Sequence, residues 1–528
     1  MMDRREFLAA AAAAALASGV PARVWGGVQL GASQRFSFDR LVEEARALAG
    51  REYEPPPAVA PAEILDAVDY DAWGAVRFDT DKALFANGPG RYPVTFFPLG
   101  RYFRTPVRVF VVMRADDGAR ARPVRYDAAD FDIPPGNPLR QLPPDAGFAG
   151  FRLQESRLGD QGKLPWRSND WAAFLGASYF RAIGALYQYG VSARGIAIDT
   201  AVAGVTEEFP RFSRFYLQTP QDDGPTVTAW AMLEGPSVTG AYRFVMTRDR
   251  AVLMDVSARL FLRRDVQRLG LAPLTSMYWF SETRKPEAVD WRPEVHDSDG
   301  LAMWTGAGEY IWRPLANPPE TRVVAFADRA PRGFGLCQRD RTFDHYLDGV
   351  YYDRRPTLWV QPRGDWGPGA VQLLELPTGS EFDDNIAAMW VPAAAARSGN
   401  EYRLDYRLHW VDREPFAPSL ARCRATRLGL AFPGDPGRRH VRRFAVAFEG
   451  GPLVDLAAGV QPEAVLSASR GRVQRTQVHP VPDDVAGHWR VLFDWTVADP
   501  GPVDLRLYLR LAGQPLTETW LYTHAATA

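Results

Sequence analysis

A strict alternation of apolar and polar side chains is the feature that most limits what this chain can fold into. In residues 401–410 every second side chain is apolar and polar or charged side chains lie between them, and residues 503–511 repeat the pattern. Successive side chains of a β-strand point to opposite faces, so a period of two predicts antiparallel strands with one buried face. Residues 442–448 and 489–497 are similar. The last quarter of the chain is therefore predicted to consist of half-buried strands.

Several such strands in succession predict a small β-sandwich that resembles an immunoglobulin domain, covering residues 395–528. The segment before it, residues 392–400, has the sequence PAAAARSGN and the composition of a linker. Residues 30–394 are expected to form a larger β-sandwich domain, because runs of strands rather than alternating strands and helices fill them. We therefore predict an all-β fold in which a large sandwich domain precedes an immunoglobulin-like one.

The larger domain contains four strand-like runs bounded by turn residues: 107–113, 241–247, 250–262 and 321–327. The 45 glycines and 43 prolines among 528 residues exceed the usual share and indicate many turns. Two segments have helical features. Residues 38–51 place Leu41, Ala45 and Leu48 near one face, which predicts a short helix. Residues 170–188 form a second candidate helix, although their two glycines disfavour it.

Residues 1–25 have the layout of a bacterial secretory signal: a charged start with Arg4 and Arg5, an apolar run, and small residues. The paired arginines favour twin-arginine export, and the mature protein is then expected in the periplasm. The alternative, an ordinary N-terminal helix, is disfavoured because the alanine-rich run has no stripe that would face a core. An oxidising compartment permits a disulfide between Cys337 and Cys423. These cysteines flank the expected domain boundary, so we favour two separate buried thiols.

Composition and missing motifs exclude several function classes. The 62 lysines and arginines nearly balance 63 acidic residues, which argues against binding to nucleic acid or through a polybasic membrane patch. The sequence contains no run of about 20 apolar residues, so no transmembrane helix is predicted. The patterns GxxxxGK[ST], HExxH and GxSxG are absent, as is a strand-linked GxGxxG. The seven histidines are scattered singly, and we expect neither a metal nor an organic cofactor.

Two acidic clusters are candidates for chemistry. The string HDSD begins at His296 and precedes Trp304, and the string EFDDN begins at Glu381 and precedes Trp390. Paired carboxylates among aromatic residues suit sugar chemistry, in which one carboxyl group protonates the leaving oxygen and the other accepts a proton. The alternative interpretation is that these strings are turns, which favour Asp, Ser and Asn in any case.

A third stretch carries polar aromatic and basic side chains that are candidates to line a cleft: Tyr179, Arg181, Tyr187, Tyr189 and Arg194. A buried seam of the sandwich filled by amphipathic side chains explains the same pattern equally well.

Long strings around these residues resemble the periplasmic glucans biosynthesis proteins of types D and G of Gram-negative bacteria. The resemblance runs from about residue 35 to the C-terminus. It rests on strings such as FLGASYFRA (174–182), YQYGVSARGIAIDT (187–200), PRGFGLCQRDR (331–341) and RPTLWVQPR (355–363). The paired arginines at the start favour the D type.

The resemblance implies a large β-sandwich followed by an immunoglobulin-like domain, and a role in making osmoregulated periplasmic glucans built from β-1,2-linked glucose. It implies membership of a glycoside hydrolase family that includes inverting endo-β-1,2-glucanases and inverting transglycosylases that cyclise the glucan. The general acid of that family falls on Asp384 and the proposed general base on Asp297. Substrate-binding candidates are Glu381, Tyr352, Tyr179, Arg181 and Trp304.

This chemistry sets two requirements. Asp384 must be protonated at neutral pH, so we expect burial or a nearby negative charge, from Asp383 or Glu381, to raise its pKa. Asp297 must stay ionised and lie at a distance from Asp384 that leaves room for the nucleophile, typically about 6.5–9.5 Å in inverting enzymes. A proton relay through water or a sugar hydroxyl would permit a larger separation.

One segment departs from the family pattern. Residues 427–442 are shorter than in hydrolytic D-type proteins and carry no tryptophan. This argues against efficient hydrolysis and leaves two outcomes open, endo-hydrolysis by water and cyclisation through attack by a sugar hydroxyl. The alternative to an enzyme is a non-catalytic glucan-binding or scaffold protein that assists the inner-membrane glucosyltransferase. An immunoglobulin-like domain and the missing tryptophans favour that alternative, whereas the presence of both Asp297 and Asp384 favours the enzyme.

Overall fold

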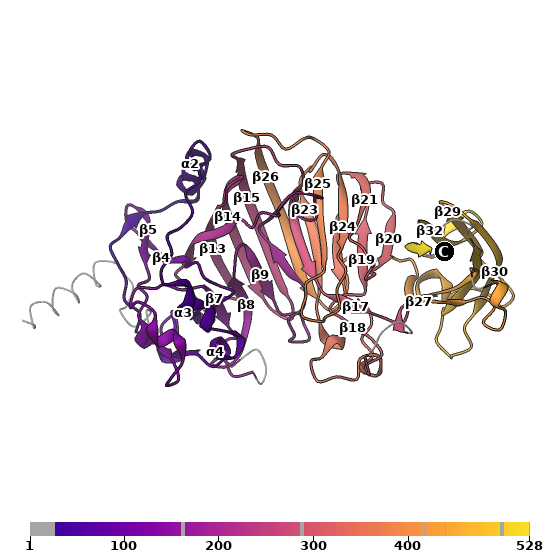
Figure 1. Cartoon of the computed structure of the whole chain (residues 1–528), viewed down its shortest axis with the longest axis horizontal. Coiled ribbons are helices and arrows are strands. Elements are labelled where there is room, and N and C mark those ends of the chain that lie inside the picture. Colours follow the sequence, from indigo (N-terminus) through magenta and orange to yellow (C-terminus); the bar gives the residue numbers. More distant parts are fainter. Residues whose placement is uncertain are drawn as a thin grey trace, which may run out of the picture. The chain divides into compact units, whose positions relative to one another are not determined.

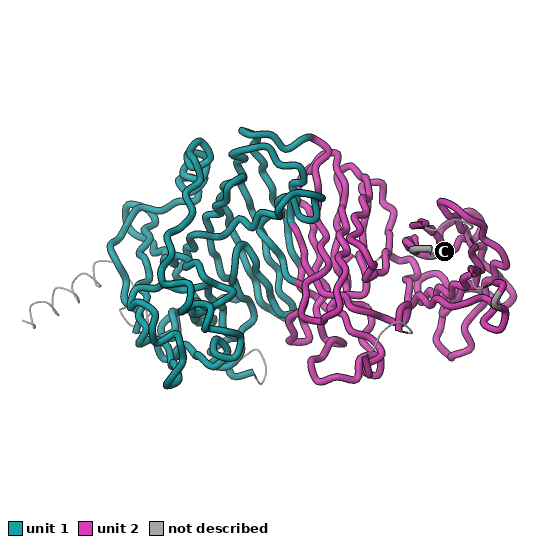
Figure 2. Tube along the Cα trace, viewed as in Figure 1, with its two compact units in different colours: residues 1–183, 192–272, 395–408 teal, residues 184–191, 273–394, 409–528 magenta. Residues whose placement is uncertain are grey.

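The computed structural model describes residues 27–159, 164–285, 290–416, 418–438, 440–496 and 501–526, and the predicted signal at residues 1–25 lies outside them. Strands dominate the described residues (Figure 1), which confirms the all-β prediction. The chain divides into two compact units, residues 1–183, 192–272 and 395–408 against residues 184–191, 273–394 and 409–528 (Figure 2). The proposed domains 30–394 and 395–528 stay a prediction.

In the first unit, one sheet has its strands in the order β1 (Gln34–Arg35), β5 (Gly118–Pro123), β4 (Arg108–Ala115), β12 (Arg211–Gln218), β13 (Thr226–Glu234), β14 (Val238–Arg248) and β15 (Val252–Leu262). Strands β4 and β12 run parallel, whereas β13, β14 and β15 are antiparallel neighbours. The long hairpin of β14 and β15 matches the predicted strands at 241–247 and 250–262.

Helix α2 (Phe38–Ala49) confirms the helix predicted over residues 38–51. The Ser37 hydroxyl accepts a hydrogen bond from the Arg40 amide at 3.2 Å, which satisfies one of the amides that have no partner within the helix. Leu41 and Ala45 are buried against the sheet in a cluster that includes Tyr216 and Met232. The apolar stripe in the sequence therefore marks the face that packs.

The second sheet of this unit has the order β3 (Val94–Phe97), β7 (Gly150–Gln154), β8 (Asp170–Leu175), β9 (Tyr179–Ala182) and β10 (Ser192–Arg194). Strand β11 (Ile196–Ile198) pairs with β16 (Leu269–Ser276). The remaining elements of the unit are the short pair β2 (Arg77–Phe78) and β6 (Phe131–Asp132), helices α3 (Ala62–Ala67) and α4 (Tyr70–Gly74), and the 3-10 turns η2 (Thr80–Lys82), η3 (Ala128–Asp130) and η4 (Pro138–Gln141).

The candidate helix over residues 170–188 was wrong, because β8 and β9 form a hairpin there. Gly176 and Ala177 lie in the turn with φ angles of 72° and 40°. A left-handed backbone at this point ends the extended strand and cannot continue a right-handed helix. The apolar run that resembled a helix face is the buried interior of β8.

In the second unit, one sheet has the order β23 (Thr357–Arg363), β22 (Gly333–Cys337), β19 (Gly300–Trp304), β20 (Tyr310–Pro314), β34 (Thr519–Ala526), β32 (Gly501–Leu511) and β29 (Glu463–Ala468), with β33 (Gln514–Pro515) beside β32. Strands β21 (Arg322–Arg329), β24 (Pro368–Glu375) and β25 (Ile386–Pro392) pair in that order. Strand β17 (Tyr278–Phe280) pairs with β18 (Val295–His296) in a separate ribbon. The 3-10 turns are η6 (Phe343–His345), η7 (Tyr352–Arg354), η8 (Pro436–Arg438) and η9 (Gly451–Leu453).

The C-terminal part of the second unit has a four-stranded sheet in the order β27 (Arg422–Leu430), β28 (Arg442–Glu449), β31 (Trp489–Thr496) and β30 (Arg472–Pro480). Its inner face contributes Phe444 and Phe493, whose rings stack 5.0 Å apart, to one core with β32 and β34. In β32 every second residue from Val503 to Leu509 is buried. Strand β26 (Glu401–Val411) shows the same alternation, so the two patterns that opened the sequence argument are confirmed as half-buried strands.

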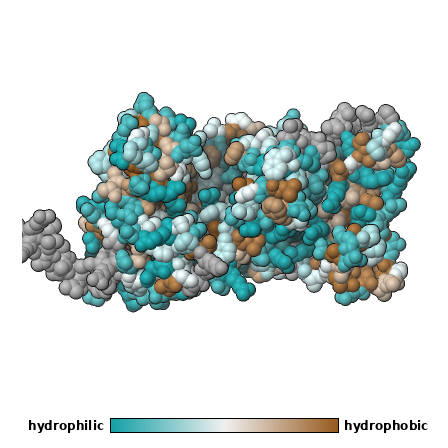
Figure 3. All heavy atoms as spheres, turned by 90° about the horizontal axis from the view of Figure 1, so that it is seen from below, coloured by the Kyte–Doolittle hydropathy of each residue, from teal (hydrophilic) through white to brown (hydrophobic). Residues whose placement is uncertain are grey.

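Cys337 and Cys423 are free and buried, which confirms the expectation of two separate thiols. Within the described residues, no helix has both the length and the apolar composition needed to cross a bilayer. One face of the molecule carries apolar residues in patches scattered among hydrophilic ones (Figure 3).

Candidate functional site

The ribbon of β17 and β18 positions the first candidate aspartate. Tyr278 of β17 pairs with His296 of β18, and Asp297 follows directly. The Asp297 amide donates a hydrogen bond to the Met277 carbonyl at 2.9 Å, which fixes the backbone at this point. The Asp297 side chain is 15% exposed and its Oδ1 lies 3.3 Å from Nε of Arg355. Asp297 is therefore a nearly buried carboxylate beside one guanidinium.

The second candidate, Asp384, is held to the same strand through its neighbour. The buried Asn385 accepts a hydrogen bond from the Tyr278 amide at 2.8 Å and donates one to the Tyr278 carbonyl at 2.9 Å. Its amide also donates to the Leu376 carbonyl at 2.9 Å. Residues 297 and 385 thus both bond to the Met277–Tyr278 segment, so the backbones that carry the two aspartates meet there. The Asp384 side chain itself is exposed, so the burial expected of it is absent in the free chain.

Glu381 lies in the loop before Asp384 and is linked to two other side chains. The Tyr352 hydroxyl donates to its Oε2 at 2.7 Å, and Arg292 donates to both carboxylate oxygens at 2.8 and 3.1 Å. The hydrogen bonds from Arg292 lower the pKa of Glu381. Burial, together with the bond to Glu381, raises the pKa of Tyr352. Glu381 is therefore ionised and Tyr352 is a neutral hydroxyl at physiological pH.

Arg292 serves more than one carboxylate. Its guanidinium bonds Asp290 at 3.0 and 3.1 Å in addition to Glu381, and Asp348 lies 3.5 Å away. The hydrogen bonds that Arg292 donates, first to Asp290 and then to Glu381, raise the pKa of Arg292. One guanidinium thus serves three carboxylates, and Glu381 shares its positive partner with Asp290 and Asp348.

Arg355 connects Asp297 to the same group. Its guanidinium lies over the Tyr352 ring at 5.0 Å and donates to the Tyr189 carbonyl at 2.6 Å. A continuous set of contacts therefore joins five side chains, which we call the carboxylate network: Asp297, Arg355, Tyr352, Glu381 and Arg292. Neither arginine was singled out from the sequence, because a single arginine has no motif; Arg355 does open one of the strings that carry the family resemblance.

A buried layer supports this network. The Gln338 amide donates to the carbonyls of His296 at 3.1 Å and Tyr352 at 3.0 Å. The His296 ring bonds Gln338 on one side at 3.1 Å and Glu294 on the other at 3.0 Å. Although burial disfavours a charged imidazole, the bond to Glu294 and the charge of Asp299 raise the pKa of His296 to about 9. His296 is thus a fixed positive group behind Asp297.

The other sequence candidates are not members of the carboxylate network. Trp304 ends β19, stacks on Tyr310 at 5.1 Å, and packs against the core of the C-terminal sheets. Trp390 is fully buried and presents no face to a ligand. Tyr179 and Arg181 belong to β9 of the first unit, where the Arg194 guanidinium lies 5.0 Å from the Tyr179 ring centroid. Their roles toward a glucan stay predictions.

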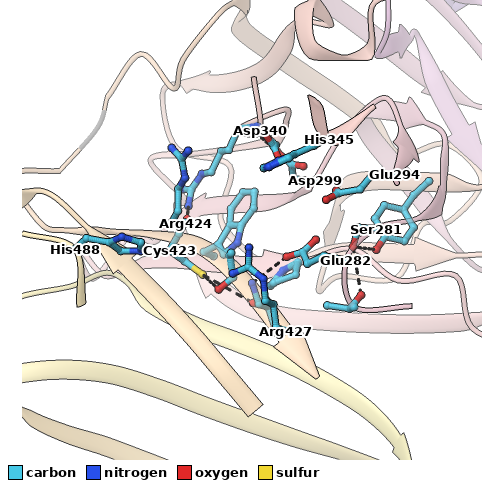
Figure 4. Close-up of a pocket in the computed structure, with 17 residues that line it drawn as sticks. Ser281, Glu282, Glu294, Asp299, Asp340, His345, Cys423, Arg424, Arg427 and His488 are labelled. Atoms are coloured by element: carbon cyan, nitrogen blue, oxygen red, sulfur yellow. Dashed lines mark hydrogen bonds and ion pairs between the residues drawn. The ribbon is translucent and has the colours of Figure 1, made fainter. Parts of the chain in front are cut away.

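Tyr278 also lines a cavity of about 230 Å³, whose labelled residues include Glu282, Glu294 and Asp340 (Figure 4). Its acidic lining residues are Glu282, Glu294, Asp299 and Asp340. Burial and the neighbouring Glu294 raise the pKa of Glu282 to about 7. Ligand atoms of Glu294, Asp340 and His345 lie within 4.8 Å of one another, the spacing needed to hold a metal ion. Glu294 already bonds His296, and His345 already bonds Asp340.

The chain is similar to curated glucan biosynthesis proteins along its whole length. The family model described as "Periplasmic glucan biosynthesis protein, MdoG" matches residues 36–524. The chain is 58% identical over 530 residues to "Glucans biosynthesis protein D 2" of Ralstonia nicotianae, covering 99% of this chain and 98% of that protein. It is 46% identical to "Glucans biosynthesis protein D" of Xanthomonas campestris pv. campestris and of Stenotrophomonas maltophilia, with the same coverage.

Proposed function

The chain belongs to the periplasmic glucan biosynthesis protein family, and from that premise we propose that it is a periplasmic, anomer-inverting enzyme that acts on β-1,2-glucan. The observation that carries the proposal is the meeting of Asp297 and Asn385, the neighbour of Asp384, on the Met277–Tyr278 segment. Asp297 and Asp384, far apart in sequence, thus start from backbone segments that meet at one strand, which supports a pair of carboxyl groups of the kind that inverting cleavage uses.

In this mechanism Asp384 is the general acid. Its proton passes to the glycosidic oxygen as the bond from that oxygen to C1 breaks, and the carboxylate remains. In the free chain Asp384 is exposed. A glucan bound across the loop would remove this side chain from water, and desolvation favours the protonated form that the reaction needs. Binding of the substrate is therefore what favours the protonated form of Asp384.

Asp297 is the general base, and the rest of the carboxylate network positions it. The nucleophile, a water or a sugar hydroxyl, loses its proton toward Asp297 while its oxygen bonds C1 from the face opposite the leaving group. Arg355 and Tyr352 lie between Asp297 and Glu381, so the network fixes the distance between the two ends of the site. Glu381 and Tyr352 offer an ionised oxygen and a neutral hydroxyl for contacts with sugar hydroxyls.

We assign ring closure rather than hydrolysis as the favoured outcome. The segment between β27 and β28 carries no tryptophan over residues 427–442. Without bulky side chains to hold a water, a hydroxyl of the same glucan chain competes for C1. Cyclic products lack one water relative to linear chains of equal length, so mass spectrometry of products from linear β-1,2-glucan separates the two outcomes. Shorter linear chains alone would refute the transglycosylase.

Catalysis is tested by replacing single aspartates with asparagine. Asp384→Asn and Asp297→Asn should each lower the rate of glucan processing by about 10²- to 10⁴-fold, the usual effect of removing a general acid or base. Asp365→Asn is the control, because Asp365 is also exposed, accepts a hydrogen bond from the Gly367 amide at 2.7 Å, and belongs neither to the loop of Asp384 nor to the carboxylate network.

The second candidate function is a non-catalytic glucan-binding or scaffold protein that assists the inner-membrane glucosyltransferase. The exposure of Asp384 favours this second function, because a carboxyl group in water is ordinarily ionised at neutral pH and then has no proton to donate. Full glucan processing by Asp384→Asn would remove Asp384 as the acid, whereas no processing of linear β-1,2-glucan by the wild-type protein would favour this function over the enzyme.

A further inference from the structure

Exposed aromatic side chains border the carboxylate network. Their exposed fractions are 70% for Trp291, 40% for Tyr351 and 90% for Phe382. Each one directly precedes or follows a member of the network: Arg292, Tyr352 and Glu381. Those three members are joined by hydrogen bonds of 2.7 and 2.8 Å. Because consecutive Cα atoms are about 3.8 Å apart, the three aromatic residues start from backbones around one centre.

The loop that exposes Phe382 is held in place by its own polar groups. The Ser380 hydroxyl accepts from the Phe382 amide at 3.1 Å, and the Thr378 hydroxyl accepts from the Ser380 amide at 3.0 Å. Asn317 accepts from the Thr378 amide at 3.0 Å and donates to its carbonyl at 2.8 Å. The ring is therefore presented to solvent by a fixed backbone. A single exposed ring is common on protein surfaces, but several such rings around one polar centre form the kind of patch that marks a binding site.

Trp291 is fixed by the residues on either side. The Asp290 carboxylate accepts from both the amide and the guanidinium of Arg292, at 2.8 and 3.0 Å. Lys285 donates to the Asp290 carbonyl at 2.8 Å. Hydrogen bonds thus hold the backbone on both sides of Trp291, and the Arg292 guanidinium lies 6.0 Å from the centre of its ring.

Tyr351 has a strained backbone. Its φ angle of 59° is in the left-handed region, which bulky side chains seldom adopt, and it stands immediately before η7. The Arg354 guanidinium lies 4.6 Å from the centre of its ring. Strain of this kind concentrates at ligand-binding positions, where the surrounding structure maintains it. Here it turns Tyr351 outward while Tyr352 points inward to Glu381.

We propose that Trp291, Tyr351 and Phe382 form an aromatic platform that stacks on the pyranose rings of a bound glucan on either side of the bond to be cleaved. This proposal rests on the proposed function and names the residues that hold its substrate. A pyranose ring has an apolar C–H face that matches a flat aromatic ring, and hydroxyl edges that match ionised and hydroxyl groups. The platform contacts the apolar face and the carboxylate network contacts the hydroxyl edges. Ligand sites commonly combine an apolar lining with a few placed polar groups in this way.

The platform adds three rings to the tryptophans that the sequence suggested for this task, of which Trp390 is fully buried and Trp304 packs against a core cluster while remaining partly exposed. It also gives binding its direction. Phe382 stands next to Glu381 in the loop of Asp384, whereas Tyr351 and Trp291 flank the partners of Glu381. A glucan chain that contacts all three rings passes beside Arg292, Tyr352 and Glu381 of the network.

The experiment measures binding apart from catalysis. Linear β-1,2-glucan oligosaccharides are titrated calorimetrically into full-length mature Asp384→Asn, which cannot consume them. Phe382→Ala and Trp291→Ala in this background should each weaken binding by about tenfold, as loss of one stacked ring does. Phe382→Tyr should retain the affinity, and Phe382→Leu should not, because leucine is apolar but not flat.

Tyr102→Ala is the matched control, since Tyr102 is 68% exposed and lies outside the platform. Unchanged affinity in both alanine variants, with the parent still binding, would overturn the platform and leave the proposed function intact. Absence of binding by the parent would overturn both. Affinity that falls equally in Phe382→Ala and Tyr102→Ala would also overturn the platform, because it would show a general effect of exposed aromatic residues.

Discussion

At the scale of single residues, the network depends on the pairing of Arg292 with the carboxylates around it. Arg292 faces Asp290, Asp348 and Glu381, and its hydrogen bonds keep Glu381 ionised. Removing one partner of a largely buried charged group costs more than the pair contributes, because the remaining charges stay in a poorly solvated place. The arginine is therefore a structural requirement of the site even though it carries no proton in the reaction.

Arg292→Met should lower the free energy of unfolding by about 2–4 kcal/mol at pH 7. The pKa values of Glu381 and Asp290 are lowered in the folded chain, first of all by their hydrogen bonds to Arg292. Their contribution is present above the unfolded pKa of 4.5 and 3.8 and is lost as pH falls through the lower folded values. Urea unfolding at pH 7 and pH 3 should therefore show a smaller difference between variant and wild type at pH 3.

Arg397→Met is the control for this prediction, because Arg397 bonds Asp265 at 2.7 Å with 66% of its side chain exposed. It should change stability little at either pH. If the loss of unfolding free energy in Arg292→Met stays constant down to pH 3, the assigned pairing of Arg292 with ionised Glu381 and Asp290 is contradicted.

At the scale of elements, the contact between the Asp384 loop and β17 depends on Asn385. Three hydrogen bonds join its side chain to the Tyr278 amide and carbonyl and to the Leu376 carbonyl. Asn385→Ala leaves these buried backbone groups without their partner, so we expect a loss of about 2–4 kcal/mol in chemical unfolding. Asn400→Ala, which removes an exposed bond to the Arg397 amide, should have a much smaller effect. Equal effects of the two substitutions would contradict this role.

The elements also show which parts of the fold could be predicted from sequence. The alternation in β26 and β32 and the apolar stripe of α2 were sufficient to predict these elements. When one face of a strand or helix is buried, apolar residues recur with the period of that element. The hairpin of β8 and β9 was missed, because the buried interior of β8 has no alternation and its turn depends on Gly176 and Ala177. The arginines of the network could not be predicted, since their partners lie in distant segments and such pairings leave no period or motif.

At the scale of the whole molecule, the C-terminal sheets and the segment before them share a core. Trp312 of β20, Trp359 of β23 and Cys337 of β22 pack with Phe444 and Trp520. Strand β34 also pairs in parallel with β20. A chain that ends at residue 394 would expose these tryptophans and lose that strand pairing, so we expect it to be insoluble or to lack a cooperative thermal transition. A truncated chain that unfolds cooperatively at the temperature of the full chain would contradict this expectation.

The central claim is that Asp384 and Asp297 carry out cleavage with inversion at C1. The most direct measurement is the anomeric configuration of C1 in freshly formed products, followed by proton NMR as the mature protein acts on linear β-1,2-glucan. Inversion predicts an α configuration, either as a new reducing end after hydrolysis or as a new linkage after ring closure. A newly formed β configuration at that carbon would contradict the account, because a retaining enzyme works through a covalent intermediate and needs a different arrangement of carboxylates.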